Sequence, residues 1–138
     1  MGLGYAEIEL ISGDDLAPYR RGYIKEDDIK RLKVNALVDS GAEMLAINEQ
    51  VKAQLDLFVL DTQRAELAGG SKVELEIVGP VKIRFANRRA SVDAIVLAGD
   101  LQILVGAIPM EGMDVLVDAK QQLIVNPDHP GKPEKLLK

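Results

Sequence analysis

Cysteine and tryptophan are both absent from this chain of 138 residues, and histidine occurs once, as His129. Without cysteine there are no disulfides, thiol nucleophiles or cysteine-ligated metals, and the composition fits a cytoplasmic protein. A single histidine argues against a Ser-His-Asp site and against a multi-histidine metal site. We therefore expect no metal and no cofactor. Any catalysis has to use carboxylates, hydroxyls, lysines or backbone groups.

Long apolar runs and an excess of positive charge are also missing. No apolar run approaches the roughly 20 residues of a membrane span, so we expect no membrane partner. The net charge is -5, whereas nucleic-acid binding needs a basic surface, so we expect no nucleic-acid partner. The length suits one domain. We expect that domain over residues 1–126, followed by a flexible Pro- and Lys-rich tail over 127–138 that includes a solvated His129.

Short segments with alternating apolar and polar residues predict a mainly β protein. Residues 5–10, 72–78 and 81–85 alternate in this way, with a turn expected at Gly79-Pro80 between the last two. Short helices are expected after Asn48, which can cap one, and around Pro109. The polar residues 13–31 predict a solvated insertion or a loop that contacts substrate. About nine short strands at regular spacing fit a closed or sandwiched β domain.

One of these strands ends on an aspartate in a turn of very small residues. The apolar residues 36–38 precede Asp39, and Ser40, Gly41 and Ala42 follow it. The Gly41 N–H can donate to the Asp39 carboxylate, the Ser40 hydroxyl can bond to the turn backbone, and Ala42 leaves room for a substrate. Turns without any function use the same residue types, so Asp-Ser-Gly alone is a weak signal.

A catalytic Asp39 needs a second carboxylate. A lone exposed aspartate, with a pKa near 4, is a poor general base. Two carboxylates in contact share one proton, and the pair can activate a water and protonate a substrate carbonyl. A two-fold copy of the chain can supply the second group. The candidates within the same chain, Asp93, Asp100, Asp114 and Asp118, are better explained as turn or solvent-facing residues, so we favour a homodimer.

The segment Leu37-Val38-Asp39-Ser40-Gly41-Ala42 resembles the core motif of the retropepsin-like (retroviral-type) aspartic proteases, in particular their prokaryotic single-domain members. The family's second motif is an apolar strand that ends in glycine before a short helix, and Val105 and Gly106, followed by residues 107–113, match it. The family also has a β-hairpin flap with a glycine-rich tip, and Gly69 and Gly70 fall where that tip would be.

This resemblance implies an all-β fold with one or two short helices, a closed acid-protease-like barrel with one lobe per chain. It implies an aspartic endopeptidase in which two Asp39 carboxylates of a homodimer activate a water to cleave a peptide or protein substrate. Ala107 and Glu43 depart from the Arg and Asp that pair in the retroviral enzymes. The alternative is a binding or assembly module of the same fold without catalysis. A cation site among the acidic residues of 14–28 is a weaker alternative, because their spacing matches no calcium loop.

Overall fold

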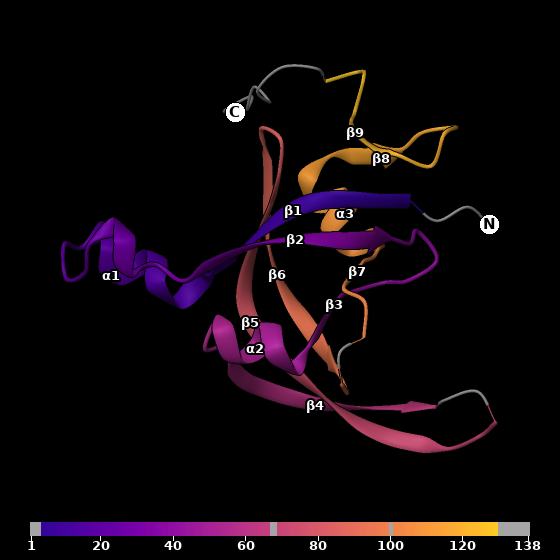
Figure 1. The fold of residues 1–138 in the computed structure, drawn as a ribbon, viewed down its shortest axis with the longest axis horizontal. Helices are drawn as coiled ribbons and strands as arrows, with labels where there is room; N and C mark the ends of the chain where they lie inside the picture. Colours follow the sequence, from indigo (N-terminus) through magenta and orange to yellow (C-terminus); the bar gives the residue numbers. More distant parts are fainter. Residues whose placement is uncertain (1–3, 67–68, 100, 130–138) are drawn as a thin grey trace, which may run out of the picture.

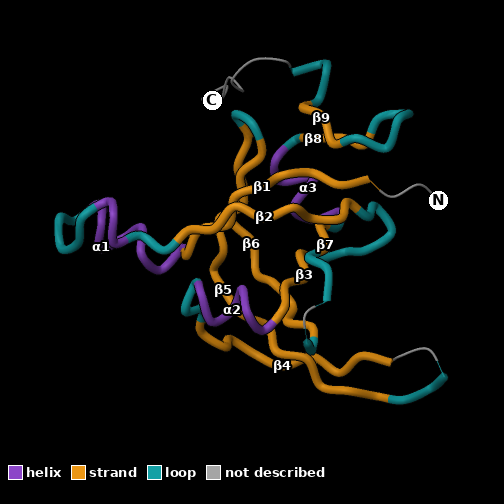
Figure 2. Tube along the Cα trace, in the orientation of Figure 1, coloured by secondary structure: helices purple, strands orange, loops and turns teal. Residues whose placement is uncertain are grey.

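Strands dominate the computed structural model, which describes residues 4–66, 69–99 and 101–129 (Figures 1 and 2). The strands are β1 (Gly4–Ser12), β2 (Arg31–Val38), β3 (Leu45–Asn48), β4 (Phe58–Glu66), β5 (Lys72–Phe85), β6 (Arg88–Leu97), β7 (Leu104–Val105), β8 (Val115–Val117) and β9 (Leu123–Val125). The helices are α1 (Leu16–Arg20), α2 (Glu49–Gln54) and α3 (Ala107–Met113), with single 3-10 turns η1 (Gly13–Asp15) and η2 (Glu26–Asp28). The prediction of a mainly β protein is confirmed.

Seven strands form one sheet in the order β1-β2-β7-β3-β6-β5-β4, and β1 also pairs with β5. The strands β8 and β9 form a separate antiparallel pair. Within the large sheet, β2 and β7 are parallel neighbours, with Leu37 opposite Leu104 and Val38 opposite Val105. Two apolar strands that are far apart in sequence therefore deliver their carboxyl ends to the same place.

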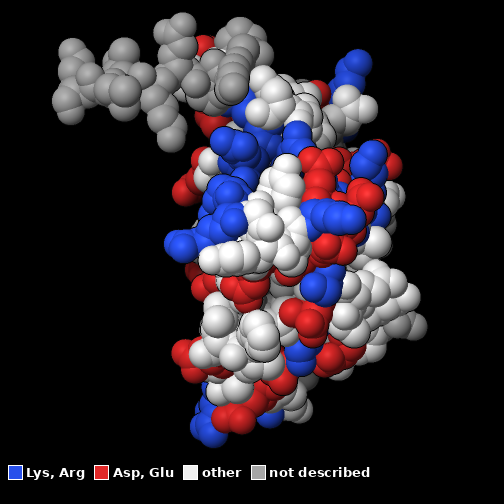
Figure 3. All heavy atoms as spheres, turned by 90° about the vertical axis from the view of Figure 1, so that its left-hand side faces the viewer, with Lys and Arg blue, Asp and Glu red and all other residues white. Residues whose placement is uncertain are grey.

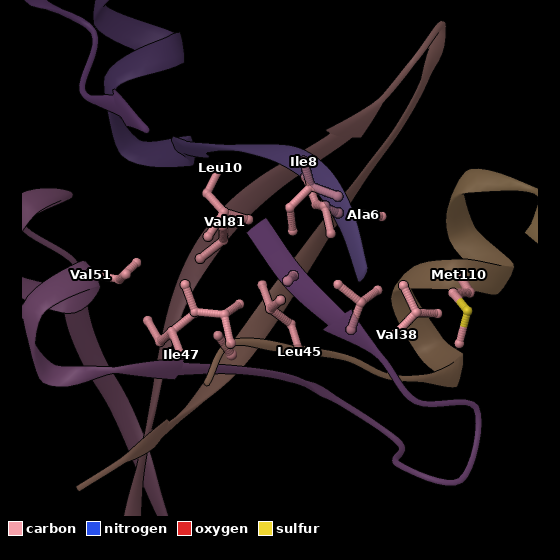
Figure 4. Close-up of a cluster of buried hydrophobic side chains, with 14 of the residues drawn as sticks. Ala6, Ile8, Leu10, Val38, Leu45, Ile47, Val51, Val81 and Met110 are labelled. Carbon is pink, nitrogen blue, oxygen red and sulfur yellow. The ribbon is translucent and has the colours of Figure 1, made fainter. Parts of the chain in front are cut away.

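The core is aliphatic, as the scarcity of aromatic residues requires. Alternation along β1 turns Ala6, Ile8 and Leu10 inward, where Figure 4 shows them facing side chains from β2, β3, β5 and α3. Val38 and Val105, the last residues of β2 and β7, are both buried in this cluster. Burial of each such side chain is worth about 1.5–3 kcal/mol, so the ends of these two strands are firmly anchored.

The prediction of a turn at Gly79-Pro80 is wrong, because both residues lie within the single strand β5. The register with β6 shifts between Val78 and Val81, and the Gly79-Pro80 peptide bond is cis. Proline is tolerated within a sheet at such an irregularity, since no ladder hydrogen bond is needed from it. A Cβ on Gly79 would lie 2.6 Å from Oδ1 of Asp93, so glycine allows the close approach of β6.

Residues 13–30 form a small lobe of short helices between β1 and β2, where the sequence predicted an irregular polar segment. Its base is closed by a hydrogen bond from Ser12 N to Lys30 O (2.9 Å) and one from Lys30 N to the Asp15 carboxylate (2.8 Å). Ile29 is buried beneath it. In Figure 1 this lobe, marked by α1, projects on the opposite side of the molecule from the loop that follows β2.

The chain after β9 is described only as far as residue 129. Residues 127–129 continue from a turn in which His129 N donates to Asn126 O (2.9 Å). The remainder of the predicted tail, 130–138, lies outside the described residues. Among the described residues, none of the helices has the length and apolar character needed to cross a membrane.

Candidate active site

Asp39 is the first residue after β2, and its carboxylate is held by the turn that follows. The backbone N–H of Gly41 donates to Oδ1 of Asp39 (2.9 Å), and Ala42 N donates to Asp39 O (3.1 Å). On its other side, Asp39 N donates to Val105 O of β7 (3.0 Å). Asp39 is half-buried, whereas Ser40 and Gly41 are exposed. The turn therefore orients a carboxylate that solvent or another molecule can still reach.

Gly106 packs directly against the backbone of this loop. A Cβ at Gly106 would lie 2.6 Å from Met44 O and 2.7 Å from Ala42 O, which is closer than real Cβ contacts come. Its φ of -92° is open to any residue, so glycine is required here by space. The two motifs, which are about 65 residues apart in the sequence, thus meet in one unit.

The start of α3 is tied to the same loop through backbone atoms. Ala107 N donates to Ala42 O and Ile108 N donates to Glu43 O, both at 2.8 Å. Ala107 and Glu43 are the two positions that depart from the Arg and Asp of the retroviral enzymes. In this chain the loop after Asp39 and the start of α3 are therefore connected through backbone hydrogen bonds.

The expected hairpin is formed by β4 and β5, which pair from Phe58 opposite Gly79 to Glu66 opposite Lys72. Gly69 and Gly70 have φ values of +94° and +89°, a region that glycine enters without steric cost. Leu67 and Ala68 of the tip lie outside the described residues. In Figure 1 the hairpin end and the loop after β2 lie toward the same side of the molecule.

The intrachain candidates for a second carboxylate have other contacts. Asp118 Oδ1 accepts from Lys120 N and Gln122 N, both at 2.9 Å, in the turn between β8 and β9. Asp93 lies against Gly79, and Asp114 is bonded as described below. Asp100 lies outside the described residues. In the described parts of the chain, no carboxylate is hydrogen-bonded to Asp39.

A polar cluster around Asp114 was missed by the sequence reading. Arg88 is buried, and its Nη1 lies 3.2 Å from Oδ2 of Asp114. Asn126 Nδ2 donates to Oδ1 of Asp114 (2.9 Å), and His129 Nδ1 lies 2.7 Å from Oδ2. Arg88 also donates to the backbone O of His129. The sequence predicted that His129 is a solvated tail residue. Its side chain is indeed exposed, but its ring also contacts Asp114.

The hydrogen bond from Asn126 holds the pKa of the Asp114 carboxyl below its ordinary value. The hydrogen bond and charge of His129, and the charge of Arg88, act in the same direction. Asp114 has a left-handed backbone (φ +58°) at the carboxyl end of α3, so the cluster joins this helix end to the segment after β9. Arg88 and Asp114 are 26 residues apart, and no local pattern marks the pair.

Two acidic residues of the insertion, Asp15 and Asp28, bind groups within it. The Asp15 carboxylate binds Lys30, and Asp28 Oδ2 accepts from Lys25 N (2.9 Å). In the parts of the chain that the structure describes, no three His, Asp or Glu side chains converge in a way that could hold a metal ion.

The chain is a mainly β lobe with one aspartate in an Asp-Ser-Gly turn. A strand that ends in glycine and a short helix pack behind this turn. These features together are those of a single-lobe aspartic-protease fold. The chain belongs to the retropepsin-like aspartyl protease family, because the family model described as aspartyl protease matches residues 24–116. This range includes Asp39, the β4–β5 hairpin and Gly106. The search of curated proteins finds no match.

Proposed function

We propose that this protein is an aspartic endopeptidase whose active form is a homodimer. The observation that carries the proposal is the Asp39 turn, in which the carboxylate accepts from Gly41 N and Gly106 packs beneath the loop. In the described residues, the intrachain candidates are not hydrogen-bonded to Asp39. A two-fold copy of the chain, with Asp39 facing its own equivalent, is the simplest source of the second carboxylate.

In this mechanism two Asp39 carboxyl groups share one proton. The ionised member takes a proton from a water held between them, and the protonated member gives its proton to the carbonyl oxygen of the scissile peptide. Neither metal nor cofactor takes part. Because the pair has to keep one proton, its two apparent pKa values belong to the pair, and activity is expected under acidic conditions.

The proposal assigns supporting roles to the other residues of the two motifs. Ser40, Gly41 and Ala42 shape the turn, and Val105 and Gly106 support it from below. The hairpin with Gly69 and Gly70 at its tip acts as a flap over the substrate. We further infer an acid-protease-like barrel, because the strand pairings run in a ring through β1, β2, β7, β3, β6 and β5. The barrel would belong to one domain over residues 1–126. We also infer that the protein is cytoplasmic.

Apolar side chains next to the Asp39 loop support the dimer. Tyr5 lies opposite Leu37 near the end of β2 and is 58% exposed, and Ile108, bonded through its N–H to Glu43, is 52% exposed. Exposed apolar side chains that form a patch mark surfaces that another molecule covers. A second copy of the chain would cover them while bringing its own Asp39.

The test is a digest of a peptide library at several values between about pH 4 and 6, with the wild type and the Asp39→Asn variant. We expect cleavage by the wild type and none by Asp39→Asn, because the amide can neither hold nor release the shared proton. Asp93→Asn is the matched control, since it neutralises an exposed aspartate of β6 and should leave cleavage unchanged. Equal cleavage by the wild type and Asp39→Asn would contradict the proposal.

One observation favours a second function, a binding or assembly module without catalysis. The Arg and Asp pair of the retroviral enzymes is absent here, where Ala107 and Glu43 occupy the two positions. A chain that stays monomeric at micromolar concentrations, and that leaves the whole library uncut at every pH, would support this second function over the first.

A further inference from the structure

The outer face of the strands β2, β1, β5 and β6 carries a group of basic side chains in an otherwise acidic chain. Residues opposite one another in an antiparallel pair point to the same face. One row across these strands is Lys33, Glu9, Arg84 and Arg89, and the next row is Arg31, Ile11, Lys82 and Ser91. We call the five cations of these rows, Arg31, Lys33, Lys82, Arg84 and Arg89, the cationic face.

Carboxylates balance only part of this charge. Glu9 lies between Arg84 (Nη1 to Oε1, 3.5 Å) and Arg31 (Nη1 to Oε2, 3.9 Å). Within the described part of the chain, Lys33, Lys82 and Arg89 have no ion pair within 4.0 Å. The cationic face therefore has more positive than negative groups, although the whole chain has a net charge of -5.

The environment of Lys82 supports this excess. Its partial burial lowers the pKa of its ammonium group, and the positive charges of Arg89, Arg20 and Arg84 lower it further. Arg20 belongs to α1, so the lobe adds a cation beside the sheet. In the view from the α1 side, Lys and Arg atoms gather along the upper part of one edge, whereas Asp and Glu atoms gather on the neighbouring part of this face and lower down (Figure 3).

The cationic face is hollowed between β1, β2 and β5. The hollow has a volume of about 400 Å³, and its lining includes Arg31, Lys33 and Arg84 together with Glu7 and Glu9. It is a recess with charged walls, which suits a polar ligand. Lys33 lies six residues before Asp39 along β2, a separation of about 20 Å at the usual rise of a strand, so the hollow is distinct from the Asp39 loop.

We propose that the cationic face is a docking site for an extended, acidic segment of a partner polypeptide. Four neighbouring strands spread its charges over three strand spacings, about 14 Å. One phosphate or carboxylate cannot reach across that width, whereas a chain with several carboxylates can. The net charge of -5 for the whole chain disfavours a nucleic acid, because its evenly spaced phosphates need a basic surface. The proposal depends on charge and register, not on the proposed peptidase activity.

The test measures fluorescence anisotropy of a labelled peptide of about twelve residues, alternating Glu and Ser, at about 50 and 200 mM salt. We expect binding at low salt that weakens at high salt, and no binding of the peptide with Gln in place of Glu. The double variant Lys33→Gln/Arg89→Gln should bind about three- to tenfold more weakly. Both side chains are exposed and without an ion pair among the described residues, so the variant should fold normally, which circular dichroism checks.

The matched control is Arg64→Gln/Lys120→Gln, which removes two exposed cations away from the cationic face and should leave the affinity unchanged. An equal loss in both double variants, binding of the Gln peptide, or tighter binding of a single-stranded DNA of equal charge would overturn the proposal. Asp39→Asn should bind the acidic peptide like the wild type. If a peptidase is found but the acidic peptide does not bind, the docking site alone is wrong.

Discussion

At the scale of residues, the Asp39 turn shows how the end of a strand can orient a carboxylate. Gly41 N fixes one carboxylate oxygen, and the backbone of Asp39 is bonded to Val105 O, so the side chain has little freedom. The small residues Ser40 and Gly41 that follow are exposed, and Asp39 itself is only half-buried. Orientation and access are the two conditions that a shared-proton mechanism places on each carboxyl group.

Gly106→Ala tests whether the two motifs depend on each other. The new Cβ would meet the carbonyl oxygens of Met44 and Ala42 at 2.6 and 2.7 Å, and backbone atoms cannot move aside cheaply. We expect the free energy of unfolding in urea to fall by about 1–3 kcal/mol, with loss of any peptidase activity. Gly70→Ala is the comparison, because its Cβ would meet open space and only the left-handed backbone is strained. Unchanged stability in Gly106→Ala would show that the packing is looser than described.

Asp114→Asn tests the polar cluster through its pH dependence. The pKa of Asp114 is lower in the folded chain than its ordinary value, so the ionised group stabilises the fold above that ordinary value, and this contribution disappears as pH falls through the folded value. Urea unfolding should therefore show the variant less stable than the wild type at pH 6–7. The difference should shrink below about pH 4. A difference that is independent of pH would contradict the assignment.

At the scale of elements, α2 depends on Asn48, the residue that precedes it and caps it. Asn48 Oδ1 accepts from Val51 N (2.9 Å), and Asn48 Nδ2 donates to Leu101 O (3.1 Å). The cap was predicted from the sequence, whereas the bond to Leu101 was not, because the two residues are 53 positions apart. The cap therefore fixes the helix start and also holds the segment before β7.

Asn48→Ala should lower the free energy of unfolding by about 1 kcal/mol through loss of the cap, and by more if the Leu101 bond contributes. Asn48→Asp keeps the capping oxygen and loses only the amide donor, so it separates the two effects in the same denaturation experiment. If Asn48→Ala is as stable as the wild type, the cap has no energetic role.

The sequence predicted most strands, because alternation of apolar and polar residues is a local property of each segment. It failed at Gly79-Pro80, where a glycine and a proline normally mark a turn. There the neighbouring strand decides the outcome, since Gly79 allows Asp93 to approach and β5 continues through the irregularity. It also missed the helices of residues 13–30, which are short and depend on the bonds between Asp15 and Lys30.

At the scale of the whole molecule, the Asp39 loop lies apart from the α1 lobe and from the cationic face. The Asp39 loop and the hairpin end lie toward one side, and the α1 lobe projects from the other (Figure 1). The cationic face lies near that lobe, since Arg20 of α1 acts on Lys82. Tyr5 and Ile108 add exposed apolar side chains near the Asp39 loop, which suits the proposed contact between copies.

Part of the candidate site could be predicted because both motifs are short and local. The sequence could not predict the Arg88 and Asp114 pair or the cationic face, because each depends on the register between strands. Lys82, Arg84 and Arg89 look like ordinary solvent-facing residues until β5 and β6 are placed side by side with β1. The pairing of β1 with β5 joins residues more than 65 positions apart, so no local pattern along the chain marks the residues that face one another.

The most direct test of the account mixes wild-type chains with Asp39→Asn chains in equal amounts, under conditions that allow subunits to exchange. If each active site needs one Asp39 from each of two chains, mixed dimers are inactive and only a quarter of the dimers are wild type. The peptidase activity per wild-type chain should then fall to about half its unmixed value. Activity per wild-type chain that stays unchanged after exchange would mean that one chain completes the site alone, and would contradict the shared carboxylate pair.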